Sequence, residues 1–205
     1  MPPWWLLGIG FTHVQILSQY AGSGLFHGMA GLPVSTDVAW FVGMGANILV
    51  LLACGAVFRG PRLDRLKRLL APSIILNIVG FLLSVWPTGV TANDDPVALL
   101  GAIALGMGQA IMFLLWADVF NRAKIEEAEI ALPLSSLVVL AYAVVVPLLP
   151  ASLNGIPMLV APLASGATLY LSFQSLPVAQ ACEKAVAIEG SRPHSMVKEL
   201  ARIAV

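Results

Sequence analysis

Residues 132–149 read LPLSSLVVLAYAVVVPLL, a run without a single charged side chain. The apolar side chains fall on every face of a helix drawn through this run, whereas a strand of a membrane barrel would alternate polar and apolar residues. In lipid every backbone polar group needs a partner within the protein, so an apolar run of this kind spans as a helix. At about 1.5 Å per residue its length approaches the roughly 30 Å of a bilayer core.

The composition of the whole chain agrees with this segment. Of its 205 residues, 59% are hydrophobic and 11% are charged, whereas a soluble domain carries about 25% charged residues. The formal net charge of zero provides no bulk attraction to nucleic acid. The two cysteines, Cys54 and Cys182, lie far apart in the sequence, and we expect neither a disulfide nor a metal cluster from them.

The sequence predicts an all-α integral membrane bundle of six transmembrane helices within residues 1–177. The expected spans are about 4–25, 38–58, 69–86, 97–120, 130–149 and 157–176. Residues 178–205 are expected to form a short cytoplasmic tail. The first span is the most polar of the six, and without it five spans would remain.

The charges predict the orientation of these spans. All 11 Lys and Arg residues fall in the loops at 59–68 and 122–124 or in the tail, and these regions share one side of a six-span bundle. The other three connections contain no basic residue and carry Asp37, Asp94 and Asp95. The positive-inside rule then places both termini in the cytoplasm and the protein in the plasma (inner) membrane. The five Trp residues lie near proposed span ends, which is typical of interfacial anchors, and the alternative is that they pack between helices.

Several polar side chains fall inside the proposed spans, where they are costly in lipid and usually face the bundle interior or a cavity. The candidates for binding an unknown small molecule are His13, Gln15, Gln19, Asn47 and Gln109. Gln15 and Gln19 share a helix face, and His13 points elsewhere. The alternative is interhelical hydrogen bonding, also available to Asn77, at about 0.6 kcal/mol for each bond.

The sequence offers little for catalysis, and we expect no enzyme activity, no cofactor and no metal site. Ser165 would have only His13 as an intramembrane partner, and nothing in the sequence orients that His. Glu126, Glu127 and Glu129 are expected in a solvated loop without His ligands. Within the proposed spans the only acidic residue is Asp118, close to the cytoplasmic end, and Arg122 follows at i+4 as its expected partner.

The loop from Gly60 to Leu69 resembles the signature loop of the major facilitator superfamily, Gly-x-x-x-Asp-Arg-x-Gly-Arg-Arg, at the same place between the second and third helices. Gly60, Asp64, Arg65 and Arg68 match this pattern, while Lys67 and Leu69 depart from it. The resemblance implies that these charges latch helix ends and set a conformational balance. The alternative is an ordinary solvated basic loop.

A second resemblance covers most of the membrane part. Gly106-Met107-Gly108, Trp116-Ala117-Asp118 with Arg122, and the stretch 162–166 look like the membrane part of actinobacterial LuxR-type transcriptional regulators. Those regulators have two facilitator-like halves and a cytoplasmic DNA-binding helix-turn-helix. This chain shows one half and no such motif, so the resemblance implies a fragment, a split subunit or a degenerate relative, and no nucleic acid is expected to bind this chain.

The expected fold is therefore a facilitator-like half with a three-plus-three inverted repeat, although no clear internal sequence repeat is present. Three functions remain open at this point. The first is a membrane module that senses a small molecule, the second a half-size secondary transporter that pairs as a homodimer or with a second membrane chain, and the third a structural membrane subunit. The absence of a carboxylate at the middle of any span disfavours a proton-driven transporter.

Overall fold

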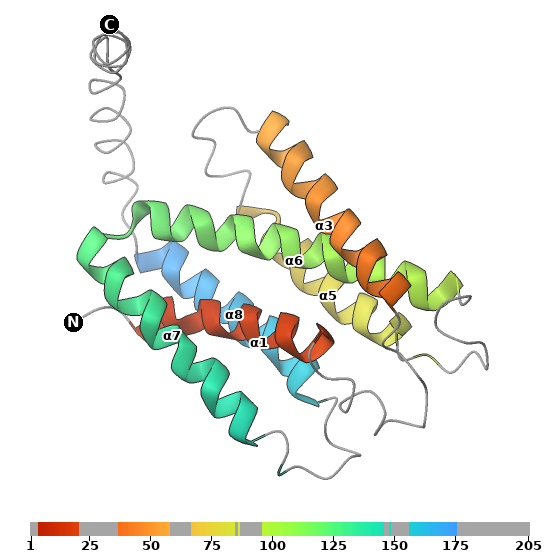
Figure 1. The fold of residues 1–205 in the computed structure, drawn as a ribbon. Helices are drawn as coiled ribbons and strands as arrows, with labels where there is room; N and C mark the ends of the chain where they lie inside the picture. Colours follow the sequence, from red (N-terminus) through yellow and green to blue (C-terminus); the bar gives the residue numbers. More distant parts are fainter. Residues whose placement is uncertain are drawn as a thin grey trace, which may run out of the picture.

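The computed structural model describes residues 4–20, 37–57, 67–84, 86, 96–145, 148 and 156–175. Within these residues the regular structure is helical throughout, which confirms the predicted all-α fold. In chain order (Figure 1), the elements are the 3-10 helix η1 (Trp4–Gly8) and the α-helices α1 (Ile9–Tyr20), α3 (Asp37–Val57), α5 (Leu70–Ser84), α6 (Pro96–Arg122), α7 (Ile125–Val145) and α8 (Ile156–Ser175).

Four helical stretches in the described residues are long and apolar enough to cross a membrane, namely Val38–Ala56, Pro96–Arg122, Ile125–Val145 and Ile156–Ser175. These stretches are typical of a membrane protein. The first and third predicted spans are apolar helices of smaller size, Trp4–Leu17 and Leu70–Ser84. The 15 residues of α5 reach only about 23 Å, which is less than the hydrocarbon core of a bilayer.

The bounds of α7 correct one expectation from the sequence. This helix begins at Ile125, so that Glu126, Glu127 and Glu129 lie in its first turns and not in a loop. Carboxylates are favourable there because they face the partial positive charge at a helix N-terminus. Likewise α6 continues to Arg122, a cation that suits the last turn. Gly60, Asp64, Arg65 and the predicted tail at 178–205 lie outside the described residues.

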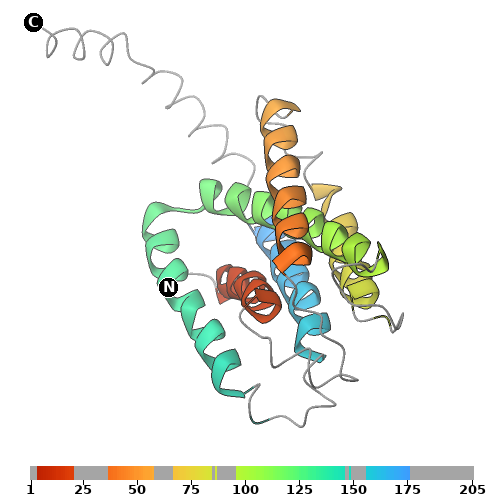
Figure 2. The same cartoon turned by 45° about the vertical axis from the view of Figure 1, so that its right-hand side comes forward.

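The long helix α6 lies at the centre of the arrangement (Figure 1), where α3, α5, α8 and α1 pack against it. On the other side, α1 packs against α7 and α8, and η1 also packs against these two helices. Figure 2, which looks nearly along α1, shows α1 between α7 and α8. The helices α3 and α7 are therefore the outermost two, since each packs mainly on one neighbour.

Small residues permit the close helix contacts. The helices α5 and α6 run antiparallel, and a Cβ atom added at Gly80 would lie 2.9 Å from the carbonyl oxygen of Gly101. A Cβ atom at Gly106 would collide with the backbone of Gly43 on α3. A Cβ atom added at Gly45, by contrast, would meet nothing within 4 Å.

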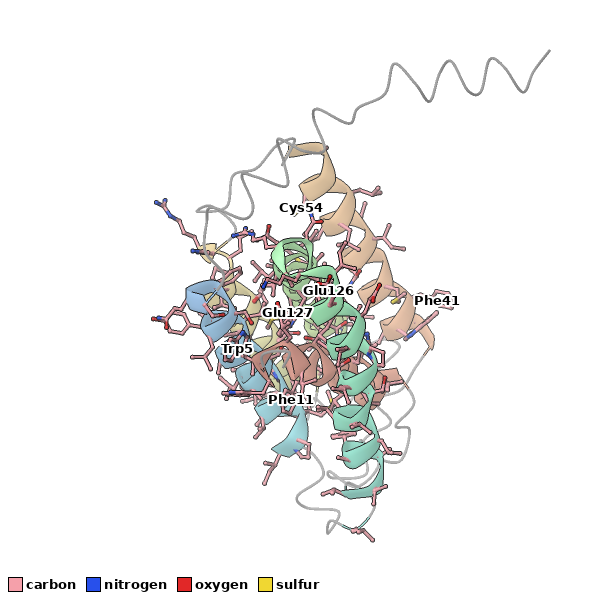
Figure 3. The ribbon with its side chains drawn as sticks, turned by 90° about the vertical axis from the view of Figure 1, so that its left-hand side faces the viewer. Trp5, Phe11, Phe41, Cys54, Glu126 and Glu127 are labelled. Carbon is pink, nitrogen blue, oxygen red and sulfur yellow. The ribbon has the colours of Figure 1, made fainter. Side chains whose placement is uncertain are left out.

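The largest buried cluster joins α6 to η1, α7 and α8. It contains Leu6, Ile9, Ile111, Met112, Leu115, Trp116, Val119, Ala123, Ala131, Leu169 and Phe173. By contrast, α3 exposes large apolar side chains such as Leu49, which is 68% exposed, and Phe41, which points away from the bundle (Figure 3). In a bilayer such side chains face lipid without penalty.

The contact between Gly106 and Gly43 generates a stability prediction. We expect Gly106→Ala to destabilise the protein by about 1–3 kcal/mol, because the added methyl group meets backbone that can only yield by moving α3. Gly45→Ala is the matched control and should gain about 0.5–1 kcal/mol from helix propensity alone. Denaturant unfolding in detergent micelles measures both variants. Equal stability changes would contradict the packing of α3 on α6.

Candidate functional site

The polar side chains of α1 divide between two faces of the helix. Thr12 and Gln15 are buried in the bundle, whereas His13 is exposed. This division follows from helical geometry, because neighbouring positions are turned by about 100° and the residues three apart lie on one side. The backbone of Gln19 belongs to α1, but its side chain lies outside the described part of the structure.

Ser165 of α8 connects three helices through its hydroxyl group. Its Oγ accepts a hydrogen bond of 2.9 Å from the indole Nε1 of Trp116 on α6. The same Oγ lies 2.8 Å from the Oγ1 of Thr12 on α1. All three side chains are completely buried. Since the indole nitrogen can only donate, the Ser165 hydroxyl accepts from Trp116 and shares its other bond with Thr12.

Gln15 makes a second buried connection between α1 and the rest of the bundle. Its Nε2 donates to the Oδ1 of Asn77 on α5 over 2.7 Å. The Nδ2 of Asn77 donates in turn to the backbone carbonyl of Ser73 over 2.8 Å. The hydroxyl of Ser73 donates to the carbonyl of Leu70 over 2.8 Å and lies 3.9 Å from the sulfur of Met112 on α6.

We call these side chains the buried polar network: Thr12, Gln15, Ser73, Asn77, Trp116 and Ser165. The network ties α1 to α5, α6 and α8 at the centre of the bundle. Sequence reasoning singled out neither Ser165 nor Trp116 for this role. Trp116 is not an interfacial anchor but takes the alternative role of packing between helices, because its indole is completely buried and its N–H is paired inside the protein.

The predicted ligand-binding residues take different positions in the structure. Gln15 belongs to the buried polar network, and Gln109 is buried on α6. Asn47 is half-buried on α3, and His13 is exposed on α1. The described part of the structure therefore does not place His13 and Gln15 on one common surface. Ligand binding by these residues stays a prediction.

His13 is oriented by its own helix. Its Nδ1 lies 3.0 Å from the carbonyl oxygen of Ile9, one turn earlier. Its ring meets the ring of Phe113 on α6 in an edge-on arrangement, with 5.7 Å between the centroids. His13 contacts Ile9 and Phe113 and not Ser165, whose hydroxyl instead faces Thr12 and Trp116. This geometry differs from the paired Ser and His that nucleophilic catalysis requires.

The predicted pair at the end of α6 is confirmed, since Asp118 and Arg122 form an ion pair. The Nε of Arg122 also donates to Oδ1 of Asp118 over 3.2 Å, and Arg122 is only 7% exposed. At the same end of the bundle, the Nζ of Lys67 lies 5.7 Å from the centroid of the Phe173 ring. Arg68, the fourth matching residue of the loop pattern, is exposed at the start of α5.

All four described Lys and Arg residues therefore gather at one end of the bundle. Lys67 and Arg68 precede α5, Arg122 ends α6 and Lys124 precedes α7, while Figure 3 shows Glu126 and Glu127 at the start of α7. In the described ranges no group of three His, Cys, Asp or Glu side chains gathers closely enough to hold a metal ion. The charged side chains at this end are the ion pair of Asp118 with Arg122 and residues that lie at or next to the ends of helices.

No family model, curated protein or solved structure matches this chain.

The pair of Gln15 and Asn77 generates a second prediction. Gln15→Leu leaves the buried Oδ1 of Asn77 without its donor, so we expect destabilisation. A double-mutant cycle with Asn77→Leu should give a coupling energy of about 0.6 kcal/mol, and at most about 1.7 kcal/mol, as for other interhelical bonds in membranes. Unfolding in detergent measures each variant, and a coupling energy of zero would show that the two amides do not interact.

Asp118 generates a third prediction. Asp118→Asn leaves the buried guanidinium of Arg122 without a counter-charge, although an amide oxygen can still accept one hydrogen bond. We expect destabilisation of about 1–3 kcal/mol, which is less than the loss for a fully buried pair. Lys124→Gln, at an exposed position beside it, should change stability by less than about 0.5 kcal/mol. Thermal unfolding of both variants tests the difference, and similar losses would refute a structural ion pair.

Proposed function

We propose that this protein is a non-enzymatic membrane module that senses a small molecule, built as a facilitator-like half of six spans. It would resemble the membrane part of LuxR-type regulators. The observation that carries the proposal is the order in which the helices contact one another. The set of helix pairs that are in contact is nearly unchanged when each of the first three α-helices is exchanged with its counterpart among the last three.

The exchange pairs α1 with α6, α3 with α7 and α5 with α8. The contact of α3 with α6 then corresponds to that of α7 with α1, and the contact of α5 with α6 to that of α8 with α1. The exchange leaves two contacts the same, namely that of α1 with α6 and that of α5 with α8. Each set of three helices packs mainly on the other set, which is typical of two interleaved repeats.

Individual residues support the same correspondence. On α6, Gly106 lies against Gly43 of α3; on α1, a Cβ at Gly10 would lie 2.5 Å from the carbonyl oxygen of Ser135 on α7. The pair α5 and α6 is antiparallel, and so is the pair α8 and α1, because Gly8 of η1 lies against Thr168 and Thr12 of α1 bonds to Ser165. These relations support a three-plus-three repeat, and with three spans in each set the two repeats would be inverted relative to each other in the membrane.

The proposal requires α1 and α5 to span although they are short. Both lie in the middle of the bundle, against α8 and α6, and a short span is accommodated by local thinning of the bilayer at modest cost. The gathering of Lys67, Arg68, Arg122 and Lys124 at one end supports a cytoplasmic location for that end, in the plasma membrane. With six spans both termini would then be cytoplasmic.

The hydrogen bonds that connect α1 to the other helices support a sensing role. A ligand shifts an equilibrium between two packings only by the difference between its affinities for them. Any displacement of α1 breaks or remakes the bonds of Thr12 to Ser165 and of Gln15 to Asn77, so it alters the contacts of α8 and α5. The buried polar network supports a bundle with discrete arrangements, because a half-satisfied polar group in lipid is unfavourable.

A second candidate is a half-size secondary transporter that pairs with itself or with another membrane chain. The interleaved contacts favour it as much as they favour a sensor. A proton-driven mechanism is not supported, since Asp118, near the positively charged end, is paired with Arg122. The two candidates differ in whether a bound molecule crosses the membrane.

The test is a thermal-stability screen of the purified protein against small uncharged amphipathic molecules, followed by flux measurements in proteoliposomes. For a sensor we expect a molecule that, at about 100 times its Kd, stabilises the protein by about 2.7 kcal/mol and is not transported. Asn47→Ala or Gln19→Ala should weaken its binding, with Gly45→Ala as the control. Flux of the molecule would establish the transporter, and binding unaffected by both variants would refute the predicted ligand residues.

A further inference from the structure

His13 is an exposed ionisable side chain near the middle of a helix that lies within the bundle. It is nine residues after the start of η1 at Trp4 and seven residues before the end of α1 at Tyr20. Ionisable side chains at such depth are costly in lipid and almost always face the bundle interior or a water-filled cavity. The exposed surface around His13 is therefore expected to be in contact with water or a polar ligand, unlike the apolar surface of α3.

The contact with Ile9 determines which nitrogen of His13 carries the proton. A backbone carbonyl only accepts, so the 3.0 Å contact requires Nδ1 to donate. In the neutral imidazole the distal nitrogen, Nε2, is then a hydrogen-bond acceptor. The bond is made to the residue one turn earlier on the same helix, so it holds the ring against α1 and leaves Nε2 as the outer end of the side chain.

The neighbour of the imidazole is an aromatic ring. The rings of Phe113 on α6 and His13 meet in an edge-on arrangement, with 5.7 Å between the ring centroids and 79° between the ring planes. An acceptor nitrogen beside an apolar aromatic ring matches a ligand that carries one hydrogen-bond donor on an aromatic or apolar body. Such a ligand would bridge α1 and α6, the two helices that the inverted arrangement pairs with each other.

We propose that Nε2 of His13 and the ring of Phe113 form a water-accessible binding site for an apolar aromatic molecule bearing a single N–H or O–H donor. This inference rests on the proposed function, because it names the chemistry of the ligand that the bundle senses. His13 lies one residue from Thr12 and two from Gln15, which bond to α8 and α5. A ligand held by His13 therefore acts on the helix that carries both connections of the buried polar network.

The first experiment asks whether the position of His13 contacts water. In the full chain with Cys54→Ala and Cys182→Ala, single variants His13→Cys and Leu49→Cys are labelled with a membrane-impermeant methanethiosulfonate reagent. Leu49 lies near the middle of α3 and is 68% exposed, so it is the control for a lipid-facing position. We expect His13→Cys to react about a hundredfold faster or more, because the reagent stays in water and attacks the thiolate, which forms in water and not in lipid. Equal rates would overturn the site.

The second experiment tests the acceptor in the protein with His13 intact. His27→Gln and His194→Gln leave His13 as the only labelled His, and its Nε2 resonance is followed by nitrogen NMR. Indole, which has one donor, should shift this resonance, whereas 1-methylindole, which has none, should not. Equal shifts, or none, would overturn the proposed ligand chemistry. The stability screen described above is independent of both results, so a lipid-facing His13 would refute this site and leave sensing by other residues standing.

Discussion

The close approach of α6 to its neighbours is the constraint on which the rest of the structure depends. In lipid, apolar burial provides no driving force between helices, so association relies on van der Waals contact and interhelical hydrogen bonds. Gly106 against Gly43 and Gly80 against Gly101 bring backbones together at distances that no side chain would allow. With α3 and α5 held in this way, α6 presents its remaining face to α1 and α8, where Trp116 fills the space between them.

The buried polar network adds directional hydrogen bonds to this packing. Contacts between apolar side chains tolerate small rotations, whereas the bonds from Gln15 to Asn77 and from Trp116 to Ser165 form in only one register. Each buried donor that lost its partner would remain unsatisfied in a medium without water. The network therefore fixes the position of α1 relative to α5, α6 and α8. In the proposed sensor, a ligand would shift an equilibrium between this arrangement and a second one.

The two polar faces of α1 serve different purposes in this scheme. Thr12 and Gln15 hold the helix against its neighbours, and His13 presents an acceptor nitrogen on the outer side beside Phe113. Both faces belong to one helix. A ligand bound at His13 would therefore act directly on the hydrogen bonds of Thr12 and Gln15.

The sequence by itself determined the all-α fold, the apolar helices and the pair of Asp118 with Arg122, because these depend on composition, on local helical spacing and on the intolerance of lipid for unpaired backbone. Only the tertiary structure decided that Ser165 joins Thr12 to Trp116 and that Gln15 bonds to Asn77. The reason is physical: partners 49 to 153 residues apart meet only through the packing of whole helices, and no local pattern encodes that packing.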